Sequence, residues 1–205
     1  MNNKEIKTAI KKIRKHIKEN DYPTISPCIK RNDPMLRCNY NCYGYVFGLT
    51  GEQYQDINQQ GVWNLGFTDQ TFGFVERFGN PNVVRYLLKN DFKKLKLKLY
   101  ESNENEKLNQ GEIKFALYSC EQDFHFVRQD ADGTWSHKMG WNCVEEKFET
   151  ENGKLKKYFP RGDKNYELMG IYKSRLKPKT KVKEPKKSEQ KFDIRVKRPA
   201  LEIGK

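Results

Sequence analysis

The residues with the clearest chemical potential are one cysteine and two histidines. Cys42 follows Asn41 in the segment Asn41-Cys42-Tyr43-Gly44-Tyr45-Val46-Phe47-Gly48-Leu49. A polar N-cap before apolar residues and two glycines predicts a short helix that packs closely on a sheet and ends near Gly48 or Gly51. A cysteine in the first turn faces the positive end of the helix dipole, which favours the thiolate and lowers the thiol pKa. Taken alone, this segment is more typical of a buried structural cysteine.

The two histidines lie in a pattern of strand, turn and strand. His125 and His137 flank the turn sequence Asp130-Ala131-Asp132-Gly133. A turn centred on Ala131 makes the histidines direct cross-strand neighbours on one face, with Cβ atoms roughly 5 Å apart. One imidazole can then fix the tautomer of the other. A cysteine, a base and an orienting group together are what an acyl-transfer site requires.

This arrangement resembles the NlpC-like branch of papain-fold cysteine peptidases. In that family a polar residue, a cysteine, a small residue and a glycine begin a helix, as Asn41-Cys42-Tyr43-Gly44 do. A histidine opens an apolar strand, as in His125-Phe126-Val127, and a second histidine ends the next strand, as His137 does. The similarity covers roughly residues 40–172. Tyr43 replaces the usual small residue, and the gap from Cys42 to His125 is longer than in compact members, which leaves the substrate class open.

The resemblance implies a Cys-His-His triad. Cys42 attacks a carbonyl or thioester carbon, His125 takes the thiol proton and protonates the leaving group, and His137 orients His125. The backbone N–H of Cys42 is one oxyanion donor, and the candidates for the second are Asn41 and Tyr40. The expected substrates are peptides, amides or other acyl compounds, with no cofactor and no metal.

Three other interpretations of these residues stay open. Asn142 and Asp132 are alternative orienting groups for His125. Cys38, Cys42, Cys120 and Cys143 could form a zinc site with the histidines, but no second pair has the tight spacing typical of zinc ligands. The Asp130–Gly133 segment is better explained as a hairpin turn than as a calcium loop, with Gly133 at positive φ.

The remaining pattern predicts an α+β fold. Ile6, Ile10, Ile13 and Ile17 form one apolar stripe of a helix within residues 1–20. Asn80-Pro81 marks the start of a second helix, which Asn90 is expected to end. We expect strands at 95–100, 112–119, 124–129, 134–137 and 166–172. The prediction is therefore a papain-like fold, with N-terminal helices packed on an antiparallel sheet of about five strands.

The net charge of +13 is concentrated at the two ends of the chain. Residues 1–20 carry +5 and residues 173–205 carry +9, whereas residues 21–172 carry −1. We therefore expect a basic amphipathic helix at 1–20, a papain-like catalytic domain at 21–172 and a basic, disordered tail at 173–205. Any weak contact with polyanions is expected to come from these two ends.

Composition narrows the class of protein. The chain has 205 residues, of which 36% are apolar and 13% aromatic, enough for a packed core. There is no apolar run of membrane-spanning length and no secretory signal, and the cysteines number five. These features predict a cytoplasmic protein, with export by another route or packaging in a virion left open. Two functions remain: a thiol-dependent hydrolase (peptidase or amidase) or acyltransferase, and a nonenzymatic basic-tailed protein that binds nucleic acid or an anionic surface.

Overall fold

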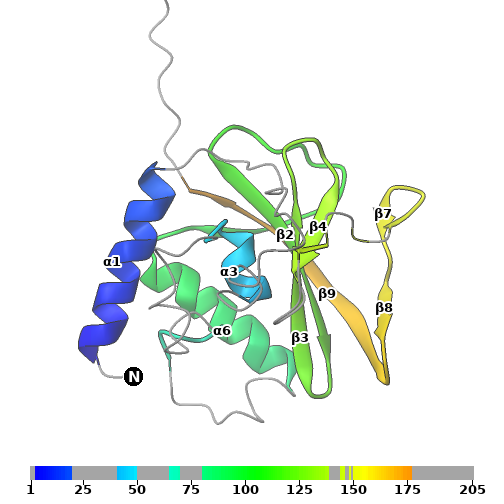
Figure 1. Ribbon diagram of the computed structural model, residues 1–205, viewed down its shortest axis with the longest axis horizontal. Helices are drawn as coiled ribbons and strands as arrows, with labels where there is room; N and C mark the ends of the chain where they lie inside the picture. The colour runs from blue at the N-terminus through cyan, green and yellow to red at the C-terminus, as the bar shows by residue number, and fades with distance from the viewer. Residues whose placement is uncertain are drawn as a thin grey trace, which may run out of the picture.

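The described part of the chain is a mixed α+β structure in which helices cover one face of an antiparallel sheet (Figure 1). The computed structural model describes residues 3–19, 41–49, 65–69, 80–138, 144–145, 148 and 150–176. The helices within these ranges are α1 (Asn3–Glu19), α3 (Cys42–Val46) and α6 (Pro81–Lys94). None of them has the length and hydropathy that crossing a bilayer requires. The predicted α+β class with an antiparallel sheet is confirmed.

The main sheet has the strand order β1-β9-β2-β3-β4-β5, and β8 also pairs with β9. Its strands are β1 (Leu99–Ser102), β2 (Glu112–Cys120), β3 (Asp123–Gln129), β4 (Trp135–Lys138), β5 (Val144–Glu145), β8 (Tyr158–Arg161) and β9 (Lys164–Arg175). A separate hairpin joins β6 (Thr150–Glu151) to β7 (Lys154–Leu155). Every residue of β2 except the last is buried, because the strand is covered on both faces. The sheet therefore has two packed faces, one of which carries the helices.

The long strand β9 differs from the predicted chain organisation. It runs through Lys173–Arg175, which sequence analysis assigned to a disordered tail, and Leu176 after it is buried. Pairing with β2 shifts register between Leu117 and Tyr118, so that Leu117 faces Gly170 and Tyr118 faces Leu168. This shift leaves Met169 unpaired at a bulge. A Cβ at the neighbouring Gly170 would lie 3.2 Å from the Tyr172 hydroxyl, so a side chain there would require that ring to shift. Residues 177–205 lie outside the described residues.

An aromatic core joins the helices to the sheet. Phe115 of β2 stacks at 5.7 Å on Phe92 of α6 and at 5.8 Å on Tyr172 of β9. Phe126 of β3 packs edge to face against the Phe115 ring, with the two ring centroids 5.8 Å apart. Offset and edge-to-face pairs of this kind add stability beyond their burial. Residues of α1 also belong to this cluster, as the apolar stripe of that helix predicts, and Ile13 is fully buried.

Helix α6 begins as predicted but ends later. Asn80 caps it by accepting a hydrogen bond from the Asn82 N–H, and Pro81 occupies the first turn. Asn90 does not end it, because the apolar face continues to Phe92. The helix closes instead with the Leu97 N–H donating to the Phe92 carbonyl at 2.9 Å, and with Lys96 at φ 59°. This is a Schellman turn, and it moves the first strand from the predicted 95–100 to Leu99–Ser102.

Candidate functional site

Cys42 occupies the first turn of α3, as predicted. The side chain of Asn41 accepts a hydrogen bond from the Gly44 N–H at 2.9 Å and so caps the helix. Gly48, at φ 64°, ends the turn that follows. The Cys42 side chain is buried, with 7% of its surface exposed. The local sequence therefore fixes the thiol at the start of a short, buried helix.

The thiol lies against strand β3, and its pKa is raised. Burial raises the pKa of Cys42 to about 11, although a hydrogen bond from the Phe126 backbone lowers it in part. The charge of Asp123 raises it further, while that of Lys138, itself fully buried, acts in the opposite direction. The prediction of a lowered pKa is wrong because α3 has only five residues, so its dipole is small beside the cost of burying a thiolate.

The two histidines form a hydrogen-bonded pair. His125 Nε2 lies 2.9 Å from His137 Nδ1, and the ring centroids are 5.0 Å apart. Strand pairing places His137 opposite Val127 rather than opposite His125. The predicted direct register is therefore wrong by two residues, because the turn is centred one residue later than Ala131. Side chains two residues apart share a face, so the pair forms along the diagonal.

The histidines and the cysteine belong to different faces of the sheet. Phe126 is part of the helix-side core that includes Cys42. His125, the preceding residue on β3, stacks at 6.0 Å on Phe159 and lies 6.5 Å from Tyr166, on the opposite face. Among the described residues, no hydrogen bond joins Cys42 to His125. The structure thus brings His125 and His137 together, and brings Cys42 only as far as the β3 backbone beside them.

The end of the β3–β4 pairing lies beside Cys42. The paired part of β3 and β4 ends where Val127 faces His137. The Phe126 backbone lies just beyond it, at the end of the ladder, which leaves it able to bond the sulfur. One residue further along β3 is His125, whose Nδ1 has no hydrogen-bond partner among the residues that the structure describes. Burial, and then the neighbouring His137, hold the pKa of His125 well below its usual value, so this imidazole is neutral at pH 7.

The other predicted site residues have varied positions. Asn41 serves as the cap of α3, and Asp132 accepts hydrogen bonds from the Thr134 N–H and hydroxyl inside the hairpin turn. Gly133 has φ 87°, as the turn prediction requires. No cluster of three metal-ligating side chains occurs within the described ranges. The remaining candidates, Tyr40, Cys38, Asn142 and Cys143, lie outside the described residues.

Sequence analysis missed a buried carboxylate next to the cysteine helix. Asp91 of α6 accepts hydrogen bonds from the Tyr43 hydroxyl at 3.2 Å, the Gly66 N–H at 2.7 Å and the Thr68 hydroxyl at 2.6 Å. Burial raises the pKa of Asp91 to about 6, although these hydrogen bonds act to lower it. Its helical spacing from the buried Leu87 could have revealed it. Tyr43, where the resembled family has a small residue, thus ties α3 to α6.

The sequence analysis also did not predict a buried ion pair that contacts α3. Arg128 Nη2 lies 2.8 Å from Asp130 Oδ1, and each side chain is only 2% exposed. The guanidinium also lies 4.4 Å from the Tyr45 ring centroid and donates to the Tyr45 carbonyl. The Tyr45 hydroxyl in turn lies 2.7 Å from the Ser136 hydroxyl. Arg128 shares its face of β3 with Phe126, so strand alternation could have predicted its burial.

Comparison with known proteins places the chain in a family without assigning it an activity. No curated protein and no solved structure matches it. Residues 33–158, more than half of the chain, match the sequence model of a family described as a domain of unknown function (DUF7689). The match spans both Cys42 and the histidine hairpin. The chain therefore belongs to the DUF7689 family.

Proposed function

We propose that the protein is a thiol-dependent hydrolase or acyltransferase with a papain-like arrangement, in which Cys42 is the nucleophile. One observation carries the proposal: Cys42 packs in the same core as Phe126, the residue next to His125 on β3, and His125 Nε2 lies at hydrogen-bond distance from His137. When Nε2 is the donor in this bond, Nδ1 is the ring nitrogen that can accept a proton. His125 is then the general base, and His137 holds its ring orientation and tautomer.

The pKa directions define how such a site would start its reaction. The thiol pKa of about 11 keeps Cys42 protonated at pH 7, and His125 is neutral. The resting pair is therefore a thiol and an imidazole, not a thiolate and an imidazolium. A neutral imidazole is the form that can act as a base, so proton transfer would accompany attack on the substrate.

The chemical steps follow from these roles. His125 takes the thiol proton while the sulfur bonds to the carbonyl carbon, and the carbonyl oxygen becomes an oxyanion. The Cys42 N–H, in the first turn of α3, has no acceptor within the helix and can donate to that oxygen. The leaving group departs with the proton from His125, giving a thioester on Cys42. Water then releases the acid in a hydrolase, or another nucleophile takes the acyl group in an acyltransferase.

Geometry sets one requirement on this mechanism. The imidazole of His125 belongs to the face opposite α3, so it must meet the sulfur around the edge of β3, where the pairing with β4 has ended. Because the Cα–Cβ bond of His125 points to the opposite face, this meeting requires the end of β3 to move together with the ring. Substrate binding would then be coupled to breaking or rearranging the hydrogen bond between His125 and His137.

Acyl-enzyme trapping tests the proposal. The full chain is incubated with p-nitrophenyl acetate, and the site of a hydroxylamine-sensitive acetyl thioester is located by peptide mass spectrometry. We expect the thioester on Cys42, a rate about 100-fold lower in His125→Gln, and a smaller loss in His137→Gln. Cys120→Ser is the matched control, because Cys120 is a half-buried free thiol at the end of β2, and it should change nothing. Acetylation of Cys120 at a rate equal to that of Cys42 would contradict the proposal.

A further inference from the structure

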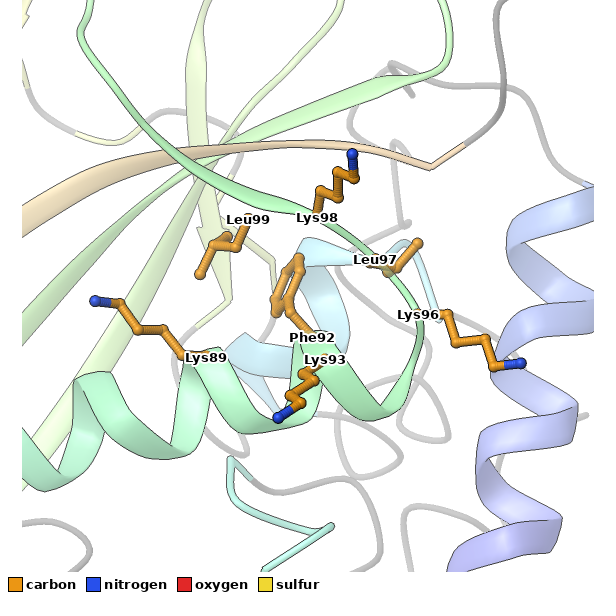
Figure 2. A pocket seen from close by; sticks show the side chains of 7 residues that line it. All are labelled: Lys89, Phe92, Lys93, Lys96, Leu97, Lys98 and Leu99. Atoms are coloured by element: carbon orange, nitrogen blue, oxygen red, sulfur yellow. The ribbon is translucent and has the colours of Figure 1, made fainter.

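A hollow lined by lysines lies where α6 ends and β1 begins (Figure 2). Its volume is about 450 Å³, and its lining consists of Lys89, Phe92, Lys93, Lys96, Leu97, Lys98 and Leu99. The four lysines are exposed, whereas Leu97 and Leu99 are half-buried. Figure 2 shows the lysine side chains extending in different directions around the three apolar residues. The hollow therefore combines an apolar floor with a cationic rim.

A second hollow extends this surface toward α1. It has a volume of about 260 Å³ and is lined by Arg14, Ile17, Lys18, Leu95, Lys96, Leu97 and Leu176. Because Lys96 and Leu97 line both hollows, the two lie side by side and form one elongated surface, called here the lysine groove. Arg14 donates to the carbonyls of Lys94 and Leu95, which holds α1 against the end of α6. The groove is thus built from two helices fixed to each other.

The charge of the lysine groove is unbalanced. No acidic side chain lines either hollow. None of Lys89, Lys93, Lys96 and Lys98 forms an ion pair with a residue in the described ranges. Like charges held around one hollow repel each other, and an anionic partner removes this repulsion when it binds. Although residues 21–172 carry a net charge of only −1, four of their lysines line this one hollow.

Backbone conformation adds an independent observation at the centre of the groove. Lys96 has φ 59°, in the left-handed region that glycine usually occupies at the end of a helix. A side chain at this position strains the backbone, and such strain is concentrated at functional sites. The left-handed turn places the Lys96 side chain at the boundary between the two hollows. A glycine would complete the same helix end without the strain but would remove this cation.

We propose that the lysine groove binds an acidic peptide segment of a partner protein, with an apolar side chain in the hollow and carboxylates at the lysine rim. The concave apolar floor fits a side chain better than it fits a flat bilayer surface. Phe92 is only 1% exposed and so cannot stack on a nucleic acid base. Charge complementarity and the apolar floor together favour a peptide that carries both acidic and large apolar residues.

Binding of a poly(Glu,Tyr) copolymer to the full chain tests this proposal by fluorescence anisotropy. The test variant carries Lys→Glu at positions 89, 93, 96 and 98. The control carries Lys→Glu at four exposed lysines that line neither hollow, Lys7, Lys11, Lys107 and Lys154, so that both have the same net charge. We expect the test variant to weaken binding at least about tenfold and the control to weaken it less than about threefold. Poly-Glu without tyrosine should bind the natural chain more weakly than the copolymer.

The single variant Lys96→Gly separates binding from folding. We expect it to weaken copolymer binding while its melting temperature stays the same or rises, because the backbone strain is relieved. Equal weakening in the two quadruple variants would overturn the proposal, since net charge alone would then explain the affinity. Tighter binding of homopolymeric RNA or of phosphatidylserine vesicles, with the same dependence on the four groove lysines, would also overturn it and assign the groove to that ligand.

Discussion

The buried charges beside α3 and the buried histidines on the opposite face of the sheet have different surroundings. On the helix face, covered by α1, α3 and α6, the buried charges have several partners: Arg128 bonds Asp130 and Tyr45, and Asp91 accepts bonds from α3 and from residues 66–68. On the opposite face, the histidine face, His125 bonds only His137 among the described residues and is otherwise surrounded by aromatic rings. The helix face therefore fixes its charges, whereas burial among aromatic rings keeps the His125 imidazole of the histidine face neutral.

This difference separates structural from chemical roles. A buried charge with several partners resists change, because each partner would lose its bond when the charge is removed. A buried neutral histidine with one partner loses only that bond when its ring moves, although burial makes its protonation costly. Cys42 lies at the boundary, with its side chain in the helix-face core and its sulfur bonded to the β3 backbone. The comparison thus predicts stability effects with opposite pH dependence on the two faces, and an effect on thiol reactivity at Cys42 between them.

The largest expected effect is the loss of the buried ion pair on the helix face. Arg128→Ala leaves Asp130 buried without its cation, so the free energy of unfolding should fall by about 3–5 kcal/mol. Urea denaturation of the natural chain and the variant measures this change. The double variant Arg128→Met/Asp130→Leu is the control and should be less destabilised than Arg128→Ala. A loss below about 1 kcal/mol in Arg128→Ala would show that this face does not depend on its buried charges.

The next effect comes from Asp91, whose native pKa of about 6 exceeds the unfolded value of 3.8. The folded state then binds the proton more tightly, so this contribution to stability is complete below pH 3.8 and is lost as pH rises through about 6. The difference amounts to about 3 kcal/mol. Unfolding free energies at several pH values between 4 and 7 should show this loss in the natural chain but not in Asp91→Asn. An identical pH dependence in both proteins would contradict the prediction.

On the histidine face the sign reverses. The pKa of His125 is depressed below the unfolded value of 6.5, so its contribution to stability is complete above pH 6.5 and is lost as pH falls. Between pH 6.5 and 5 this contribution is at most about 2 kcal/mol. His125→Gln should remove this acid sensitivity, whereas Asp91→Asn should leave it in place. Thermal denaturation of both variants over this pH range would reveal whether the two faces oppose each other.

The smallest effect concerns Asp123, which connects the two faces. Its carboxylate accepts a bond from Tyr166 on the histidine face and raises the pKa of Cys42 on the other side. Asp123→Asn should lower the Cys42 pKa modestly and change stability by less than about 1 kcal/mol, because the ion pair with Lys164 is half-exposed. The pH dependence of iodoacetamide labelling at Cys42, located by peptide mass spectrometry, reports the change. A rise in the pKa would reverse the assigned role.

Local sequence was sufficient for much of the fold and for part of the site. Asn41 and Asn80 marked the starts of α3 and α6, because N-capping depends on neighbouring residues alone. The alternation around His125 and His137 placed both on one face of a hairpin. The end of α6 was predicted wrongly, because the packing of Phe92, and not the propensity of Asn90, decides where the helix ends.

The chemical state of the site could not be read from the sequence in the same way. A cysteine at a helix start predicts a low pKa, and the structure gives about 11, because burial is set by residues far along the chain. Asp91 meets Tyr43 across 48 positions, so neither residue alone indicates that contact. The lysine groove likewise depends on how α1 packs against the end of α6.

The sequence by itself determined which residues carry chemistry and which elements hold them, since caps, turns and alternation act over a few residues. Only the tertiary structure decided which face of the sheet each one occupies, which groups are neutral and where the cations gather. The physical reason is that desolvation and charge interactions depend on distances between segments remote in the sequence. Cys42 and His125 show both cases, because the sequence singles them out and packing alone sets their pKa values and their separation.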